Sequence, residues 1–449
     1  MKHSRSKLPA MFAVLFCIAL LAGVGVLLWK TLPEKQKPEQ AETIQTDGVF
    51  SNEPTTVEPE REAPYEGELP GQAAQPETPD EQPQPGTDDQ NETDPQTPDS
   101  PEASAAQQTA QALLDTMTDE EKIWQLFFVT PEAITNVNTA TVAGETTKKA
   151  LEQYPVGGIV YFAKNLEDRE QTVALLENTQ SYAKIPLFLG VDEEGGTVSR
   201  VGSNPDMGVP SVGDMRSLGK QQDPAAAYAA GQDIGGSLHA LGFNLDFAPV
   251  ADVAQGADSV IGSRSFGSDP ELCASLAGVI VKSLRAEGIV SCLKHFPGYG
   301  NNADTHTGIA LDARPYTTFE KSDLVPFESG IAAGAPFVLV SHNIVECMDG
   351  AYPASLSAKV HTLLRDTLGF TGVIVTDDLA MDAVKAYAQD GSAAVLAIQA
   401  GNDMIVTTDY QTQIPQVIAA VQYGEIAESD IDAHVFRVLH EKQALGLID

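Results

Sequence analysis

The chain has 449 residues, a net charge of −36 and 4 cysteines. Such an acidic chain is a poor candidate for binding nucleic acid or anionic lipid, because both are negatively charged. The cysteines after residue 30, Cys273, Cys292 and Cys347, are odd in number and widely spaced, so they indicate neither a disulfide framework nor a zinc site. We expect them to be small buried apolar residues.

The first 30 residues have the pattern of a membrane anchor. Residues 1–7 are basic, residues 8–29 are apolar apart from small residues, and Lys30 ends the run. About 20 apolar residues are enough to cross a bilayer as a helix. The preceding positive charge predicts a cytoplasmic amino terminus and places the rest of the chain outside the cell. Residues 1–30 are therefore predicted to be a transmembrane signal-anchor, and the alternative is a cleaved signal peptide with secretion.

Residues 31–108 are rich in Pro, Glu, Gln, Thr and Asp and contain almost no large apolar residues. A segment of this composition cannot bury enough apolar surface to offset the entropy lost on ordering. We predict a disordered acidic linker between the membrane and the remaining domain, residues 109–449.

In residues 109–449, short apolar runs alternate with helical patterns. The expected strands are residues 126–129, 158–162, 187–191, 243–247, 289–293, 337–341, 373–376 and 404–406. Helices are expected at residues 169–183, 224–241, 270–287 and 392–400. This α/β alternation predicts a single (β/α)₈ TIM-type barrel. A doubly wound open sheet is the alternative, although the chain lacks the Gly-rich phosphate motif typical of that fold.

Polar side chains follow several of the predicted strands. They are Asp192 and Arg200 after the third, Asp252 and Arg264 after the fourth, Lys294 and His295 after the fifth, His342 after the sixth, and Asp377 and Asp378 after the seventh. Singly, each could be a helix cap, a surface ion pair, a turn-former or a core histidine. Together they would be costly to bury in a barrel unless they bind a polar ligand at its carboxyl-terminal face.

Residues 294–310, KHFPGYGNNADTHTGIA, form a predicted loop after the fifth strand. The loop holds Asp304 two residues before His306. A carboxylate beside an imidazole can fix its tautomer and raise its proton affinity, which suits proton transfer near neutral pH. Alone, such a pair is more often a surface or turn feature.

KHFPGYG with a downstream Asp-x-His resembles the signature of glycoside hydrolase family 3, in its bacterial β-N-acetylglucosaminidase branch. The resemblance covers residues 111–449 and includes residues 376–381, TDDLAM. It implies that Asp377 is the nucleophile and that His306, oriented by Asp304, is the acid and base. It further implies sugar-binding roles for other residues: Asp192, Arg200, Arg264, Lys294 and His295.

The chain departs from the family pattern at several positions. Tyr299 stands where His is usual, and in the run DEEGGTVSR Glu193 replaces Gln, Thr197 replaces Arg and Ser199 replaces Gln. These changes leave the matching Asp192 and Arg200 in place. We expect the changes at residues 193, 197 and 199 to alter the preference for the leaving group or for a second sugar, and Tyr299 to affect the resting conformation of the loop.

The expected activity is that of a retaining, exo-acting β-N-acetylhexosaminidase. It would release terminal β-linked GlcNAc from peptidoglycan-derived fragments through a covalent glycosyl-aspartate. No metal or organic cofactor is implied, and we expect a monomer at the outer face of the cell membrane. The alternatives are a family 3 β-glucosidase, β-xylosidase or β-GlcNAc phosphorylase, or a non-catalytic glycan-binding module. A binding module, however, has no need of a nucleophile and a proton donor.

Overall fold

The computed structural model describes residues 101–449, except residues 255, 257–259, 301–307, 309, 382–383, 385–386, 388–391 and 449, and side chains from residue 107 onward. The predicted anchor and nearly all of the predicted linker lie outside the described residues. The chain separates into two units, Met1–Glu92 and Thr93–Asp449, and the second contains every described residue. No helix in this described part is long and apolar enough to cross a membrane.

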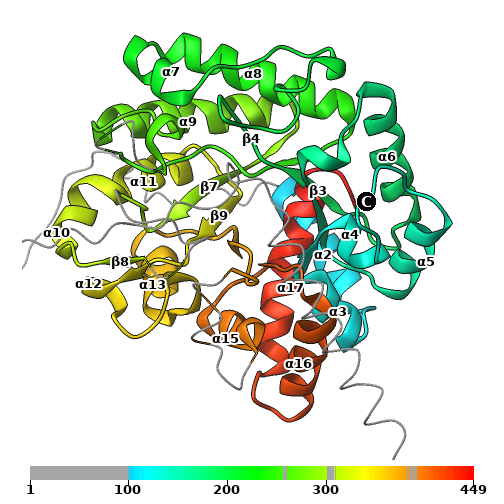
Figure 1. The fold of residues 1–449 in the computed structure, drawn as a ribbon. Helices are drawn as coiled ribbons and strands as arrows, with labels where there is room; N and C mark the ends of the chain where they lie inside the picture. The colour runs from blue at the N-terminus through cyan, green and yellow to red at the C-terminus, as the bar shows by residue number, and fades with distance from the viewer. Residues whose placement is uncertain are drawn as a thin grey trace, which may run out of the picture. The chain divides into compact units, whose positions relative to one another are not determined.

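The second unit is an α/β fold around one parallel sheet (Figure 1). Its strands are β1 (Phe127–Val129), β2 (Gly158–Tyr161), β3 (Phe188–Val191), β6 (Leu245–Asp246), β7 (Val290–Phe296), β9 (Phe337–Val340), β11 (Val373–Thr376) and β12 (Ile405–Val406). The 8 strands follow the order β11-β9-β7-β6-β3-β2-β1-β12. All the predicted strands are therefore confirmed, with ends shifted by a few residues.

The two outer strands of this order meet. Val375 of β11 forms a parallel bridge with Met404, next to β12, and the Thr376 amide donates to the Met404 carbonyl at 3.1 Å. The sheet is thus a nearly closed barrel, consistent with a TIM-type fold. The alternative of an open sheet is wrong, because an open sheet leaves its outer strands apart.

The predicted helices form with clear start signals. They are α6 (Arg169–Tyr182), α8 (Pro224–Leu241), α9 (Pro270–Ala286) and α15 (Ala393–Ala400). Each begins after a side chain that accepts a backbone N–H of the first turn: Asp168, Asp223, Asp269 and Ser392. Helices α8 and α9 lie side by side, and a Cβ at Gly231 would come within 1.8 Å of the Ser283 hydroxyl.

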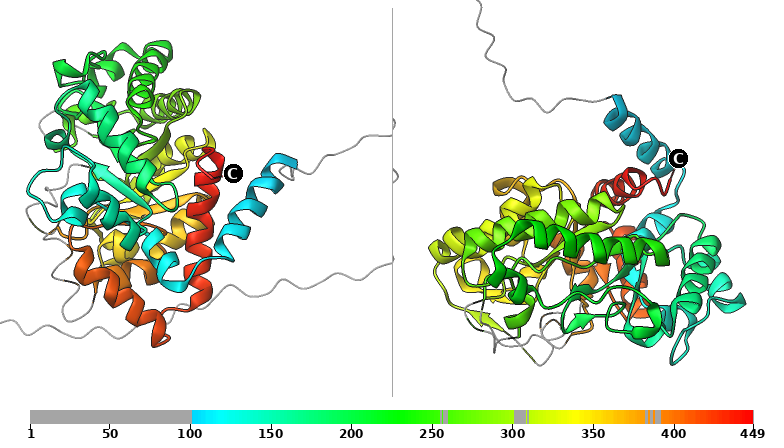
Figure 2. Two further views of the ribbon diagram at one scale, coloured as in Figure 1. Left: turned by 90° about the vertical axis from the view of Figure 1, so that its right-hand side faces the viewer. Right: turned by 90° about the horizontal axis from the view of Figure 1, so that it is seen from above.

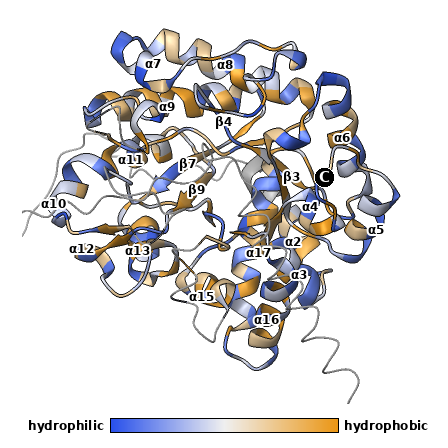
Figure 3. Cartoon of the chain, in the orientation of Figure 1, coloured by the Kyte–Doolittle hydropathy of each residue, from blue (hydrophilic) through white to orange (hydrophobic). Residues whose placement is uncertain are grey.

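Further α-helices of the described residues lie around the sheet. They are α2 (Pro101–Leu114), α3 (Asp119–Gln125), α4 (Pro131–Thr135), α5 (Glu145–Gln153), α7 (Met215–Gln221), α10 (Tyr316–Thr318), α11 (Leu324–Ala332), α12 (Glu346–Asp349), α13 (Ala358–Thr362), α16 (Tyr410–Gln422) and α17 (Glu428–Ala444). Helix α17 packs along α2 and contacts α3 (Figure 2). Apolar residues gather on the strands, whereas polar residues colour the outer faces of the helices (Figure 3).

The barrel interior is filled largely by aromatic rings. Phe188 lies 6.2 Å from Phe128 and 5.1 Å from Phe337, measured between ring centroids, and Phe128 lies 5.6 Å from Phe247. Lys442 of α17 is fully buried, with its Nζ 5.3 Å from the centre of the Phe188 ring. A barrel packed in this way holds no channel, so a ligand must bind at an end.

Two local expectations are wrong. Strand β7 continues past Leu293 to Phe296, so Lys294 and His295 belong to the strand instead of following it. The strand can continue because Val340 of β9 pairs with Phe296 after a shift of register. Cys273 and Cys292 are buried as expected, but Cys347 is exposed because it lies on the short surface helix α12.

Candidate active site

A cavity of about 430 Å³ opens at the carboxyl-terminal ends of the strands. Every predicted catalytic or binding residue that the structure describes lines it: Asp192, Arg200, Arg264, Lys294, His295 and Asp377. Asp304 and His306 lie outside the described residues. The cavity walls also include apolar groups such as Phe162, Phe247 and Met381. The predicted cluster of charges therefore shares one pocket.

A small hairpin after β3 brings acidic side chains to this pocket. Strand β4 (Glu193–Gly195) pairs antiparallel with β5 (Val198–Ser199). Because successive side chains in a strand point to opposite faces, Asp192 and Glu194 both face the cavity, and Glu193 does not. The sequence singled out Asp192 but not Glu194, because the alternation applies only once residues 193–195 are known to form a strand.

Glu194 joins two cations of the site. Its Oε1 lies 2.6 Å from Lys294 Nζ, and Arg264 binds both its oxygens at 2.7 Å. Lys294 Nζ also donates to Asp192 Oδ1 at 2.7 Å. The group joins residues at the ends of β3, β6 and β7, which are neighbours in the sheet, so the pairing of these strands brings it together.

These buried groups stay charged because they lie together. Burial raises the pKa of Glu194, but the positive charges of Lys294 and Arg264 outweigh this and lower it to about 2. Burial lowers the pKa of Lys294, and the neighbouring carboxylates of Asp192 and Glu194 raise it above its ordinary value. At neutral pH the site therefore presents fixed ammonium and guanidinium donors to a ligand.

Asp252 holds His295 in a defined orientation. Asp252 is fully buried, and its Oδ2 lies 2.7 Å from His295 Nδ1 and 3.2 Å from the His295 amide. The Tyr299 amide donates to Oδ1 at 2.6 Å. Since a carboxylate only accepts, Nδ1 carries the proton and Nε2, 3.3 Å from the Arg264 guanidinium, can accept. Asp252 thus ties the start of the KHFPGYG segment to β6 and does not merely cap its own turn.

Asp377 directly follows β11 and faces the cavity. Its amide donates to the Val340 carbonyl at 3.3 Å, and its Oδ1 accepts the Asp378 amide at 2.8 Å. Asp378 accepts the Ala380 amide at 2.9 Å, which is a local hydrogen bond in the turn after β11. A strand end and local hydrogen bonds therefore fix the backbone at Asp377.

His342 is a buried histidine that supports the same segment. Its Nδ1 lies 2.7 Å from the Ser355 hydroxyl, and its Nε2 lies 3.1 Å from the Asp378 carbonyl. The alternative of a core histidine is thus confirmed.

Arg200 differs from the other cations of the site. It is half-buried and lines the cavity, and its buried Nε has no hydrogen-bond partner among the described residues. A guanidinium in this position is suited to binding a ligand oxygen. The described residues include no group of three or more His, Cys, Asp or Glu side chains arranged to hold a metal ion.

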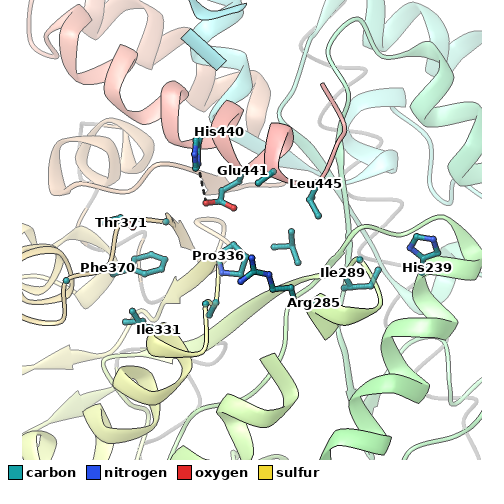
Figure 4. Close-up of a pocket in the computed structure, with 17 residues that line it drawn as sticks. His239, Arg285, Ile289, Ile331, Pro336, Phe370, Thr371, His440, Glu441 and Leu445 are labelled. Carbon is teal, nitrogen blue, oxygen red and sulfur yellow. Dashed lines mark ion pairs between the residues drawn. The ribbon is translucent and has the colours of Figure 1, made fainter. Parts of the chain in front are cut away.

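A second cavity, of about 670 Å³, lies at the opposite end of the barrel (Figure 4). The starts of β7 and β9 line it together with the end of α17, and its walls include Ile289, Pro336 and Phe370. The ion pair drawn there, His440 with Glu441, spans 3.8 Å. Although larger, this cavity holds none of the predicted site residues, so chemistry and not size identifies the candidate active site.

Comparison with known proteins agrees with the geometry. The model of the "Glycosyl hydrolase family 3 N terminal domain" matches residues 118–440. The chain is 35% identical over 291 residues to a β-hexosaminidase of Nitrosomonas eutropha. The matched region covers 63% of this chain and 82% of the relative.

Solved structures give the same family. A glycoside hydrolase family 3 β-N-acetylglucosaminidase from Paenibacillus sp. str. FPU-7 superposes with a TM-score of 0.69 at 33% identity, over 74% of this chain and 63% of that one. A β-N-acetylhexosaminidase from Beutenbergia cavernae superposes with a TM-score of 0.63 at 29% identity, over 74% and 99%. The chain therefore belongs to glycosyl hydrolase family 3 and is a glycoside hydrolase.

Proposed function

We propose that the protein is a retaining, exo-acting β-N-acetylhexosaminidase that removes terminal β-linked GlcNAc. The observation that carries this proposal is the position of Asp377, at the end of β11 in the same cavity as Lys294, Arg264, Arg200 and Asp192. A sugar ring needs hydrogen-bond partners in several fixed directions, and these side chains supply both donors and acceptors. The names of the similar proteins support the choice of substrate.

In the proposed reaction the Asp377 carboxylate attacks the anomeric carbon as the bond to the leaving oxygen breaks. His306, oriented by Asp304, gives that oxygen a proton, and a glycosyl-aspartate forms. The imidazole then takes a proton from water, which attacks the same carbon and releases the sugar and the Asp377 carboxylate. Lys294, Arg264, Arg200, His295 and Asp192 bind the sugar throughout.

The natural setting is part of the same proposal. Peptidoglycan-derived fragments are substrates with terminal β-GlcNAc that an enzyme outside a bacterial cell would meet. We propose that residues 1–30 anchor the protein in the membrane and that it acts as a monomer. Release of the protein from membranes by detergent but not by high salt would support the anchor, whereas recovery in the culture medium would support signal cleavage.

One assay tests the activity. The purified full-length chain is given para-nitrophenyl β-N-acetylglucosaminide or para-nitrophenyl β-glucoside, with and without phosphate. We expect faster turnover of the GlcNAc substrate, free GlcNAc as product in both buffers, and a trapped sugar on the peptide that contains Asp377. Preference for the glucoside, formation of a sugar phosphate, or labelling of another residue would contradict the proposal.

A further inference from the structure

Glu193 lies in the β4–β5 hairpin between two residues of the cavity but faces the other way. Asp192 and Glu194 line the cavity, while the Glu193 side chain is buried behind it with an exposed fraction of 3%. A buried carboxylate needs hydrogen-bond donors. Glu193 finds them in the segment that returns from the hairpin, residues 199–202.

The carboxylate binds this segment at several points. Its Oε2 accepts the Val201 amide at 2.7 Å, and its Oε1 accepts the Gly202 amide at 3.1 Å and the Ser199 hydroxyl. A Cβ at position 202 would lie 2.9 Å from Oε1, so a side chain there would displace the carboxylate. Hydrogen bonds to a charged acceptor are stronger than those to a neutral acceptor. Glu193 therefore fixes the path of the chain on both sides of residue 200.

Arg200 is the residue held between these contacts. Ser199 and Val201 are bound to Glu193 on its two flanks, and its own side chain lines the cavity. Its Nε has no hydrogen-bond partner among the described residues, so no described group fixes the guanidinium at this atom. The backbone conformation set by Glu193 then decides where the guanidinium points.

We propose that Glu193 is a positioning residue for substrate binding, which directs the Arg200 guanidinium toward the sugar; this inference rests on the proposed function. Burial raises the pKa of Glu193, while the hydrogen bonds from Ser199, Val201 and Gly202 partly offset this effect. The Glu193 side chain does not line the cavity. Because Arg200 would bind the sugar in the ground state and the transition state alike, loss of its orientation affects KM and not kcat.

The test is a double-mutant cycle in the full-length chain with para-nitrophenyl β-N-acetylglucosaminide. Glu193→Gln keeps the shape but weakens the acceptor, and we expect KM to rise about tenfold with kcat changed by no more than about twofold. Arg200→Ala should raise KM at least as much. In the variant that carries both changes, KM should equal that of Arg200→Ala alone, because Glu193 acts through Arg200.

A matched control separates positioning from general stability. Glu132 is another buried glutamate that binds a loop, through the Ala140 amide at 3.1 Å and the side-chain amide of Asn165, but it does not line the cavity. Glu132→Gln should lower Tm without changing KM. If Glu193→Gln does the same, or if its effect on KM adds to that of Arg200→Ala, the inference is overturned.

Further measurements distinguish a failure of this inference from a failure of the proposed function. Should Glu193→Gln not fold, Ser199→Ala removes one donor to the carboxylate and should raise KM about twofold, again with no effect in the Arg200→Ala background. An additive effect there would overturn the inference. A wild-type chain that does not hydrolyse the GlcNAc substrate overturns the proposed function, whereas an active wild type with unchanged KM in these variants overturns the inference alone.

Discussion

The barrel has a buried ionic network at each end, and the two differ in what their members face. At the carboxyl-terminal end, Glu194 binds Lys294 and Arg264 beside an open cavity. At the amino-terminal end, the fully buried Asp403, just before β12, binds His434 at 2.8 Å and Arg437 at 2.7 Å and also contacts Arg365.

In the second network the protein itself satisfies the charges. Asp403 also accepts the Ile374 amide at 2.7 Å, and Arg365 donates to the carbonyls of Phe370 and Gly372. Burial raises the pKa of Asp403, but His434 and the two arginines lower it to about 2. The pKa of Glu194 is also lowered to about 2, so a perturbed pKa does not by itself distinguish a binding site from a structural network. His434 and Arg437 also line a cavity, of about 330 Å³. The difference is that the first network shares its cavity with Asp377 and with Arg200, whose Nε has no hydrogen-bond partner among the described residues.

Asp377→Asn should have the largest effect. The amide cannot form the glycosyl intermediate, and we expect kcat to fall by about 10⁴-fold with little change in Tm. Steady-state kinetics and thermal melts measure both. Asp378→Asn is the control, because Asp378 lines the same cavity but its carboxylate accepts the Ala380 amide, and a loss as large in this variant would argue against Asp377 as the nucleophile.

Glu194→Gln should reduce kcat/KM by about 10²- to 10³-fold. It leaves Lys294 and Arg264 without the carboxylate that they share, and removal of one partner of a buried charge pair costs about 2–5 kcal/mol. The kinetics are compared at a temperature well below the melting transition. Unchanged kcat/KM would mean that the Glu194 network, like the Asp403 network, serves only stability.

Asp403→Asn should lower the stability of the protein and leave its activity unchanged. We expect the free energy of unfolding to fall by about 3 kcal/mol, because Arg365, Arg437 and His434 lose their common anion. Denaturant unfolding measures this loss. Michaelis parameters of the folded variant should match those of the wild type, and a selective loss of kcat would show that the two ends of the barrel are coupled.

Lys442→Met should have the smallest effect, and it should stabilise the protein instead of destabilising it. Burial lowers the pKa of Lys442 to about 7, so between pH 7 and its ordinary value of 10.5 the unfolded chain binds more protons than the folded one. Wild-type stability should therefore rise with pH across this window. The variant should be more stable than the wild type by about 1–3 kcal/mol at pH 7, and this difference in the free energy of unfolding should shrink toward pH 10.

The control for this change is Lys282→Met, which replaces an exposed lysine of α9. Its stability relative to the wild type should be the same at both pH values. If the stability difference between Lys442→Met and the wild type stays constant with pH, Lys442 keeps its proton through its hydrogen bond to Gln125.

Much of the fold could be predicted because its signals are local. Short apolar runs mark the strands, and capping residues such as Asp223 and Asp269 mark the helix starts. The end of β7 could not be predicted, because pairing with β9 carries the strand through Lys294 and His295. Glu194 was missed because in a run of adjacent acids only the pairing of the hairpin shows which carboxylates share a face.

By itself, the sequence determined the type and order of the elements and the candidate residues at the strand ends, since these depend on neighbours within a few positions. Only the tertiary structure decided which charges meet. Arg264 reaches Glu194 across a separation of 70 residues, and Lys294 reaches Asp192 across 102. Such contacts arise when β3, β6 and β7 pair side by side and bring their carboxyl-terminal ends to one cavity, and no local pattern records their distances.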